Sequence, residues 1–292
     1  MYLRIEDTGN EVSQIQTLLN KSINAGLTVD GHFGKKTQQA VKDFQKINKL
    51  KVDGIVGQKT YSELLVSQTD KHELYEKQGD YDIEDNPNEF INNNSKYIWI
   101  IDAGHGGMID GKYVTPGKRS PKVPPGVYEG VVNRQISKYL YELLIDNDID
   151  CVLLVPENED VSLGERVRRA NKIHKETHRC RYVSIHCNAA GNGNEWNMAN
   201  GIDTFYDKNS SGSRNMAKTI QDRLIEFTKR RDRGIKQANF YVLRSTLMPA
   251  VLCECGFMTN YEEAVLLSTD EYQKLVAHSI LEGIFDIEDE DN

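Results

Sequence analysis

The sequence predicts a mainly parallel, helix-covered α/β domain preceded by a small all-α module of about three helices. Three observations lead to this fold class. From residue 96 onward, short apolar segments typical of strands alternate with amphipathic helical segments. A nine-residue pattern occurs twice near the start of the chain. Between these regions, residues 67–95 are polar, rich in Asn and Asp, and without periodicity, which is typical of a linker.

The repeated pattern is V-D-G-x-x-G-x-x-T, at residues 29–37 and 52–60. In each copy Asp-Gly favours a tight turn, and the threonine is a candidate helix N-cap. Two sets of apolar residues, before and between the copies, each follow helical spacing: Val12, Ile15, Leu18, Leu19 and Ile23, then Ala40, Val41, Phe44 and Ile47. Residues 1–66 are therefore expected to form a small helical domain.

The larger domain is expected to span residues 96–286, followed by an acidic tail at 287–292. Parallel sheets gather ligand chemistry beyond the carboxyl ends of their strands, so strand ends are the places to search for function. We expect strands at 96–102, 150–155, 181–187, 201–207, 239–243 and 249–255, and helices at 129–146, about 162–175, 211–230 and 270–285.

Composition excludes several classes of protein. The formal net charge of -8 argues against a general nucleic-acid binder. No apolar run approaches the roughly 20 residues that span a bilayer, so no membrane insertion is expected. The first residues lack a basic stretch followed by an apolar one, so we expect no secretory signal. Five cysteines do not suggest a disulfide framework, and synthesis in a reducing (host) cytoplasm is expected.

Residues capable of metal or acid/base chemistry end three of the expected strands. His105 follows the first strand in a glycine-rich turn, His186 lies in SIHCN, and Glu254 lies near the end of the last strand. Glu129 begins the first long helix. Two histidines and a carboxylate with one open position form the ligand set of a catalytic zinc site, and a separate glutamate can serve as the base. Singly, such residues are more often structural, but four on one sheet edge favour a site.

Two other groups could suggest a metal. His174 and His178 share a helix face, but they lie at the end of a helix on the opposite edge of the sheet, where a solvated basic terminus is expected. Neighbouring residues of a strand point to opposite faces, so three cysteines should point away from the candidate site: Cys187, Cys253 and Cys255. We interpret them as buried apolar thiols, and assign no metal to the remaining histidines: His32, His72 and His278.

Several segments, in order over about residues 97–285, resemble the zinc-dependent N-acetylmuramoyl-L-alanine amidases of the Amidase_3 type. They are IIDAGHGG, the helix start at Glu129, SLGERVRRAN, YVSIHCNA and DRGIKQANFYVLRSTLMPAVLCECGFMTN. Residues 29–45 carry V-D-G-x-F-G-x-x-T…A-V-x-x-F-Q, which resembles the peptidoglycan-binding type 1 module.

This resemblance implies one Zn²⁺ held by His105, Glu129 and His186, with Glu254 as the catalytic acid/base. It implies bacterial peptidoglycan as the substrate and, as the bond that is cut, the amide between N-acetylmuramic acid and L-alanine. The proline-rich, basic loop at 106–128 departs from the family pattern and is expected to form a wall of the substrate groove. Candidate substrate contacts are Asn188, Arg233, Asn239 and Arg244, although structural roles explain the arginines about as well.

Three functions remain open at this point. The chain could be a wall-lytic amidase, a zinc peptidase that cuts a stem-peptide bond, or a wall-binding protein without activity. Without a signal peptide, an enzyme directed at the wall would be released as a phage endolysin or as an autolysin freed at lysis. The presence of Glu254 favours an enzyme over a binder.

Overall fold

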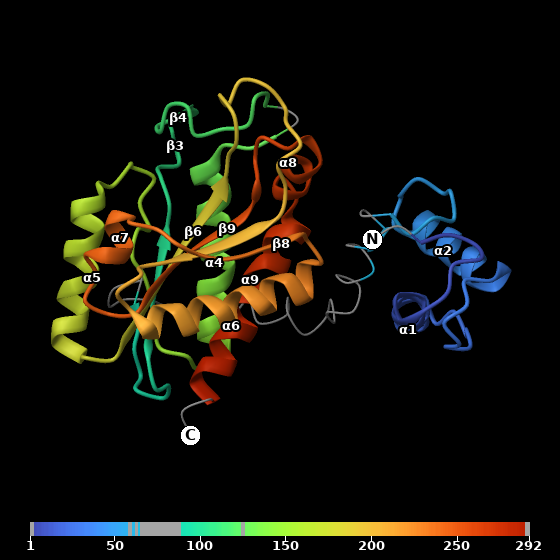
Figure 1. Cartoon of the computed structure of the whole chain (residues 1–292), viewed down its shortest axis with the longest axis horizontal. Coiled ribbons are helices and arrows are strands. Elements are labelled where there is room, and N and C mark those ends of the chain that lie inside the picture. Colours follow the sequence, from blue (N-terminus) through green and yellow to red (C-terminus); the bar gives the residue numbers. More distant parts are fainter. Residues whose placement is uncertain (1–2, 58–59, 62–63, 65–88, 124–125, 290–292) are drawn as a thin grey trace. The chain divides into compact units, whose positions relative to one another are not determined.

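The computed structural model describes residues 3–57, 60–61, 64, 89–123 and 126–289 (Figure 1). Its contacts divide the chain into two compact units, Met1–Asp82 and Ile83–Asn292. No helix in these described ranges is long and apolar enough to cross a membrane.

The first unit contains helices α1 (Asn10–Ile23) and α2 (Lys35–Ile47) around an apolar core. Thr60, Tyr61 and Leu64 are also helical, while the other residues of the expected third helix lie outside the described residues. This core consists of side chains from both helices and from the repeated turns: Leu3, Val12, Ile15, Leu19, Phe33, Ala40, Val41, Phe44, Val56, Tyr61 and Leu64.

The repeated pattern corresponds to a repeated hydrogen-bond arrangement. The Gln16 side chain accepts from the backbone N–H groups of Asp30 and Gly31 at 3.1 and 2.9 Å. The Gln45 side chain does the same for Asp53 and Gly54, also at 3.1 and 2.9 Å. The expected threonine caps are wrong: Gly34 is the N-cap of α2, and the Thr37 and Thr60 hydroxyls instead accept from the two glutamine side chains.

The second unit is built on a seven-stranded sheet in the order β1-β5-β2-β6-β9-β7-β8. Strands β5, β2, β6 and β9 run parallel, whereas β1 and β7 are antiparallel to their neighbours β5 and β9. The strands are β1 (Glu89–Phe90), β2 (Ile98–Ala103), β5 (Cys151–Leu153), β6 (Cys180–Asn188), β7 (Ile202–Tyr206), β8 (Asp232–Gln237) and β9 (Ala250–Phe257), with a separate hairpin of β3 (Met108–Ile109) and β4 (Lys112–Tyr113).

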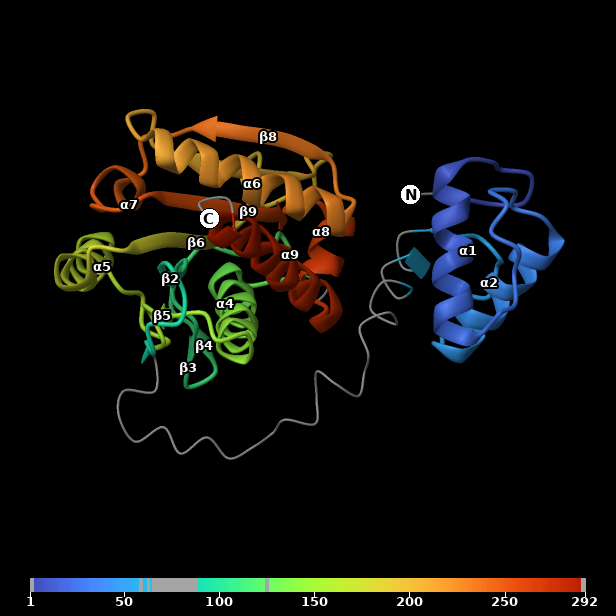
Figure 2. The same cartoon turned by 90° about the horizontal axis from the view of Figure 1, so that it is seen from below.

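Helices cover both faces of this sheet, so each face has its own apolar core. One face packs against α4 (Glu129–Asp146), α6 (Ser211–Thr228), α8 (Tyr261–Leu267) and α9 (Asp270–Asp289). The other packs against α5 (Leu163–Thr177) and α7 (Tyr241–Arg244), which lie side by side and apart from α4 and α9 in both views (Figures 1 and 2). The expected covered, mainly parallel sheet is confirmed.

The prediction of a strand at 239–243 is wrong, because the strand lies at Asp232–Gln237 and residues 241–244 form α7. Val242 and Leu243 are adjacent and both buried against the sheet. A helical turn can bury two adjacent side chains on one face, whereas a strand would point one of them away. Residues that are common in strands occur here because their side chains pack against the sheet, and not because this segment is one of its hydrogen-bonded strands.

The domain boundaries expected from composition are also displaced. Glu89–Phe90, expected within the linker, pair with β5 at the sheet edge. The expected acidic tail begins inside α9, and the Glu288 carboxylate accepts hydrogen bonds from the Tyr97 backbone and the Trp99 indole at 3.3 and 2.7 Å. An acidic residue satisfies donors where β2 begins, which composition alone does not reveal. The remainder of both segments, 65–88 and 290–292, lies outside the described residues.

Candidate metal centre

The candidate residues converge at the carboxyl ends of the central parallel strands. His186 of β6 and Glu254 of β9 are direct neighbours in register. Both point to the α5/α7 face, as the flanking residues Tyr182 and Leu252 do. Just beyond this pair, Gly256 has φ +140° at a bulge between β6 and β9, a conformation that favours glycine. The strand β9 continues through Gly256 to Phe257.

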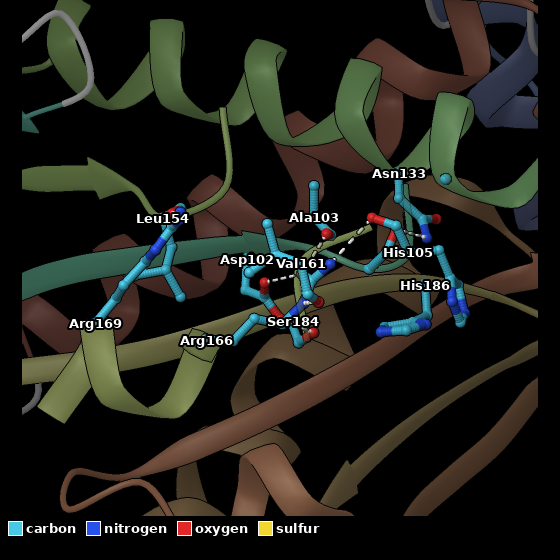
Figure 3. Close-up of polar contacts among 12 residues, drawn as sticks. Asp102, Ala103, His105, Asn133, Leu154, Val161, Arg166, Arg169, Ser184 and His186 are labelled. Carbon is cyan, nitrogen blue, oxygen red and sulfur yellow. Dashed lines mark hydrogen bonds and ion pairs between the residues drawn. The ribbon is translucent and has the colours of Figure 1, made fainter. Parts of the chain in front are cut away.

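His105 lies in the turn after β2 with φ +63°, the left-handed region that side chains other than glycine rarely adopt. The preceding Gly104 allows its ring to approach His186, because a Cβ at position 104 would lie 2.3 Å from the His186 imidazole. The two imidazole centroids are 5.0 Å apart and nearly perpendicular, and Figure 3 shows the two side chains together.

Glu129, the first residue of α4, completes this group from the other side of the sheet edge. Its carboxylate oxygen Oε1 lies 3.2 Å from His105 Nε2 and 3.1 Å from His186 Nδ1. Burial acts to raise the pKa of Glu129, but contacts with the two histidines outweigh it and hold the pKa well below the ordinary value. The carboxylate is therefore charged and points at the two imidazoles.

Glu254 lies beside this group and is not equivalent to Glu129. Its Oε2 atom is buried and has no hydrogen-bond partner among the described residues. Burial, and then the negative charges of Glu129 and Asp203, raise the pKa of Glu254 well above its ordinary value. A buried, unpartnered carboxyl with a raised pKa is typical of a group that exchanges protons with a ligand.

These four residues share one cavity of about 650 Å³. One wall is apolar and comes from the starts of α5 and α7, with Leu163, Phe240 and Tyr241 each more than a third exposed. The rest of the lining is more polar and includes Lys118 of the 106–128 loop and Asn188. The loop was expected to form a wall of the groove, and Lys118 is the part of it that reaches this cavity.

The donor set fits a zinc ion. Candidate ligand atoms of His105, Glu129 and His186 all lie within 4.8 Å of one another. Zn²⁺ in proteins takes imidazole nitrogen and carboxylate oxygen ligands, and catalytic sites leave one position for water or substrate. The cavity supplies that open side, and the unpartnered oxygen of Glu254 faces the same space.

Sequence reasoning missed Asp203, which lies directly across from Glu254 on β7. It is buried, accepts hydrogen bonds from Asn188 Nδ2 at 3.0 Å and Arg233 Nε at 2.9 Å, and pairs with Lys236. A lone acid in the otherwise apolar strand GIDTFY was the available signal. Asp203 therefore anchors two of the candidate substrate contacts.

The four candidate substrate contacts differ in whether they line the cavity. Asn188 lines the cavity, whereas Arg233, Asn239 and Arg244 do not belong to its described lining. Arg233 packs over the Phe257 ring at 4.8 Å, and Arg244 packs over the Tyr241 ring at 4.9 Å while donating to the Asn239 carbonyl.

The cysteines near the candidate centre have the positions that strand alternation predicts, whereas His174, expected at a solvated helix end, is partly buried. Three thiols pack in the core on the α4/α9 face, away from the candidate centre: Cys187, Cys253 and Cys255. Within the described part of the chain, the group of His105, Glu129 and His186 is the one arrangement found that could hold a metal. His174 and His178 form a ring contact at the end of α5, His32 is exposed, His278 lies near Glu282, and His72 lies outside the described residues.

Comparison with known families gives two matches. Residues 100–286 match the family described as N-acetylmuramoyl-L-alanine amidase. Residues 8–64 match the family described as a putative peptidoglycan binding domain. The first match covers strands β5 to β9 and every residue of the candidate centre, and the second covers helices α1 and α2.

Curated relatives are consistent with the first match. The chain is 33% identical over 186 residues to the uncharacterized protein YqiI of Bacillus subtilis, covering 63% of this chain and 81% of YqiI. It is 32% identical to the N-acetylmuramoyl-L-alanine amidase LytC of the same organism, covering 63% of this chain but only 34% of LytC. It is also 32% identical to the endolysin of Bacillus phage SPP1, covering 66% of each.

Solved structures show the same architecture. An N-acetylmuramoyl-L-alanine amidase from Clostridium difficile 630 is 35% identical and superposes with a TM-score of 0.57, covering 68% of this chain and all of that one. The catalytic domain of the amidase CwlV from Bacillus (Paenibacillus) polymyxa is 29% identical with a TM-score of 0.54, covering 65% of this chain and 97% of that one.

Proposed function

This chain belongs to the N-acetylmuramoyl-L-alanine amidase family, and from that premise we propose that it hydrolyses the amide between N-acetylmuramic acid and L-alanine in peptidoglycan with the help of Zn²⁺. The observation that carries the proposal is the convergence of His105, Glu129 and His186 beside the unpartnered carboxyl of Glu254 in one cavity. The named amidases among the relatives and solved structures support peptidoglycan amidase activity.

Zinc would be held by His105 and His186, with Glu129 as the carboxylate ligand. When bound there, Zn²⁺ supplies Lewis-acid polarisation of the amide carbonyl and lowers the pKa of a coordinated water to about 7. The pKa of Glu129 is already well below its ordinary value, so this ligand is deprotonated at neutral pH and needs to lose no proton when the metal binds.

Glu254 would move the protons. Its unpartnered oxygen accepts a proton from the attacking water and returns it to the nitrogen of the departing L-alanine. The raised pKa of Glu254 favours the second step, because a carboxyl with a raised pKa retains the accepted proton more readily than an ordinary carboxyl until the leaving nitrogen receives it. Such acid/base catalysis contributes typically 10²–10⁴-fold.

The cavity lining suggests where the substrate lies. Asn188, whose side chain reaches the cavity while Asp203 orients it, is the candidate contact that we retain as direct. For Arg233 and Arg244 we propose indirect roles, through Asp203 and through Tyr241 of the apolar wall. Asn239 would assist by accepting from Arg244.

Residues 8–64 would tether the catalytic domain to its polymeric substrate. A second binding unit on the same chain raises the local concentration of the enzyme at the wall without adding contacts in the active site. The similarity to the phage SPP1 endolysin supports a lytic role, as an endolysin or as an autolysin released at lysis.

The test is to incubate the full chain with purified peptidoglycan, with and without a zinc chelator, and to identify the newly exposed groups. We expect new L-alanine amino termini, no new reducing sugars, and loss of both release and lysis when the metal is removed. A different new amino terminus would support the stem-peptide peptidase instead, and binding without release would support a wall-binding protein.

A further inference from the structure

The backbone carbonyl of His105 accepts hydrogen bonds from two arginines on two different helices. Arg134 of α4 donates through Nη1 at 2.7 Å, and Arg166 of α5 donates through Nη2 at 3.0 Å. One carbonyl oxygen has two lone pairs, so these two donors use its full accepting capacity. Because both donors are charged, each bond is stronger than an ordinary amide hydrogen bond.

His105 needs external support because of its backbone conformation. With φ +63°, this residue adopts a left-handed conformation that costs a non-glycine residue free energy. Such a conformation persists only where the surroundings determine it. A change in φ at His105 is a rotation about its N–Cα bond, which moves the carbonyl and the side chain together. Such a rotation would turn the carbonyl away from both guanidinium groups and displace the imidazole.

Arg166 is itself held on every side. Its Nε donates to the Val161 carbonyl at 2.8 Å, and its Nη1 donates to the Ala103 carbonyl at 2.6 Å and pairs with the Asp102 carboxylate (Figure 3). The side chain is only 2% exposed. A guanidinium fixed by three groups presents its Nη2 to the His105 carbonyl in one position only.

Asp102, which pairs with Arg166, is in turn held by two residues of the neighbouring strand β6. Asp102 is buried and its second oxygen accepts from the Tyr182 hydroxyl at 2.7 Å and the Ser184 hydroxyl at 2.8 Å. Burial acts to raise the pKa of Asp102, but Arg166 and the two hydroxyls outweigh it, so the pKa lies below its ordinary value. The carboxylate thus remains charged and keeps Arg166 in place.

Arg134 is anchored separately. Its Nε and Nη2 both donate to the Glu157 carbonyl, at 3.0 and 2.9 Å, in the loop after β5. Two helices and two independent anchors therefore act on one carbonyl of one metal-ligand candidate. If the two arginines only stabilised the fold, they would not both need to donate to the same oxygen atom, the carbonyl of His105.

We propose that Arg134 and Arg166 are positioning residues that set the zinc affinity of the site by fixing the peptide unit of His105. This inference rests on the proposed zinc-dependent function. Contacts that orient a ligand typically change metal affinity 10–100-fold when they are lost. The two arginines bind the backbone carbonyl of His105 and not its imidazole, so they are not among the side chains that contact the candidate metal-ligating atoms.

The test measures zinc affinity of the full-length protein by chelator competition, together with the thermal midpoint of the metal-free protein. Arg134→Met and Arg166→Lys each remove a bond to His105, and both are expected to weaken zinc binding about 10–100-fold. The control is Arg223→Met on α6, where Arg223 pairs with Glu226 and Asp286. It should lower the thermal midpoint but leave zinc affinity unchanged.

The outcomes distinguish the positioning role of the two arginines from the proposed zinc chemistry. Wild-type affinity in a folded Arg134→Met protein, or equal losses in Arg223→Met, would overturn the positioning role while leaving the proposed function intact. If Arg166→Lys fails to fold, Arg134→Met decides, because Arg134 is only half-buried. Absence of zinc binding by the wild-type protein would overturn the proposed zinc chemistry and this inference with it.

Discussion

The two faces of β6 and β9 carry opposite chemistry. On the face toward α5 and α7, His186 and Glu254 border an open cavity. On the face toward α4 and α9, three free thiols are enclosed in the core: Cys187, Cys253 and Cys255. Strand alternation alone separates these sets, since neighbouring residues point in opposite directions.

The electrostatic consequences of burial differ between the faces. On the cavity face, Asp102 is charged and paired with Arg166. On the core face, burial raises the pKa of the cysteine thiols, so they remain protonated and uncharged. Glu254 therefore borders the cavity, whereas Cys253 and Cys255 on either side of it pack in the core on the opposite face. Four predictions test this separation.

Glu254→Gln should have the largest effect on activity. It removes the proton acceptor but keeps the shape of the side chain, so kcat should fall about 10²–10⁴-fold. Zinc affinity should be retained, because Glu254 is not among the ligand candidates. Turnover can be measured by release of L-alanine amino termini, and zinc content by elemental analysis. Undiminished turnover in the variant would refute the role of Glu254.

Asp102→Asn should have the largest effect on stability. It leaves the buried guanidinium of Arg166 without a counter-charge, which typically costs about 3–5 kcal/mol. Urea unfolding followed by tryptophan fluorescence measures this in the α/β unit, since both tryptophans, Trp99 and Trp196, belong to it.

The control for this variant is Asp222→Asn, which removes an exposed pair with Lys218 on α6. An exposed pair contributes at most about 1 kcal/mol. Similar losses in the two variants would show that the Asp102 pair is no more important to the fold than a surface ion pair.

The free energy of unfolding should depend on pH in alkaline solution because of the buried thiols on the α4/α9 face. Burial raises the pKa of Cys253 from 9.0 to about 12, so above pH 9 the unfolded chain loses this proton while the folded chain keeps it. The free energy of unfolding should therefore decrease between pH 9 and 12, by about 1.4 kcal/mol from this group at pH 10. The measurement is the difference between the wild-type and Cys253→Ala pH profiles, and parallel profiles would contradict it.

Cys187→Ala should have the smallest effect. Loss of one buried sulfur is comparable to loss of a methyl group and should cost about 1 kcal/mol of stability. Zinc affinity and turnover should be unchanged, although Cys187 adjoins His186 in the sequence. A large loss of zinc would show that a thiol takes part in the metal site and would remove the distinction between the two faces.

Much of the site could be predicted because its residues have local signals. His105, His186 and Glu254 each lie at or just beyond the carboxyl end of an apolar strand, and Glu129 begins a strongly periodic helix. The structure brings all four into one cavity. Local signals failed at residues 239–243, where β-rich composition belongs to a helical turn, and at Glu288, where acidic composition suggested a solvated tail.

Patterns along the chain were enough to predict the alternation of strands and helices, the repeat of the first unit, and the faces on which His186, Glu254 and the cysteines lie. These features depend on periodicity within one element, which can be read from neighbouring residues. In contrast, the position of Asp203 beside Glu254, and the meeting of Arg134 and Arg166 at the His105 carbonyl, follow from tertiary packing. Such contacts join residues far apart in the chain, and their geometry exists only after the sheet and its helices have packed.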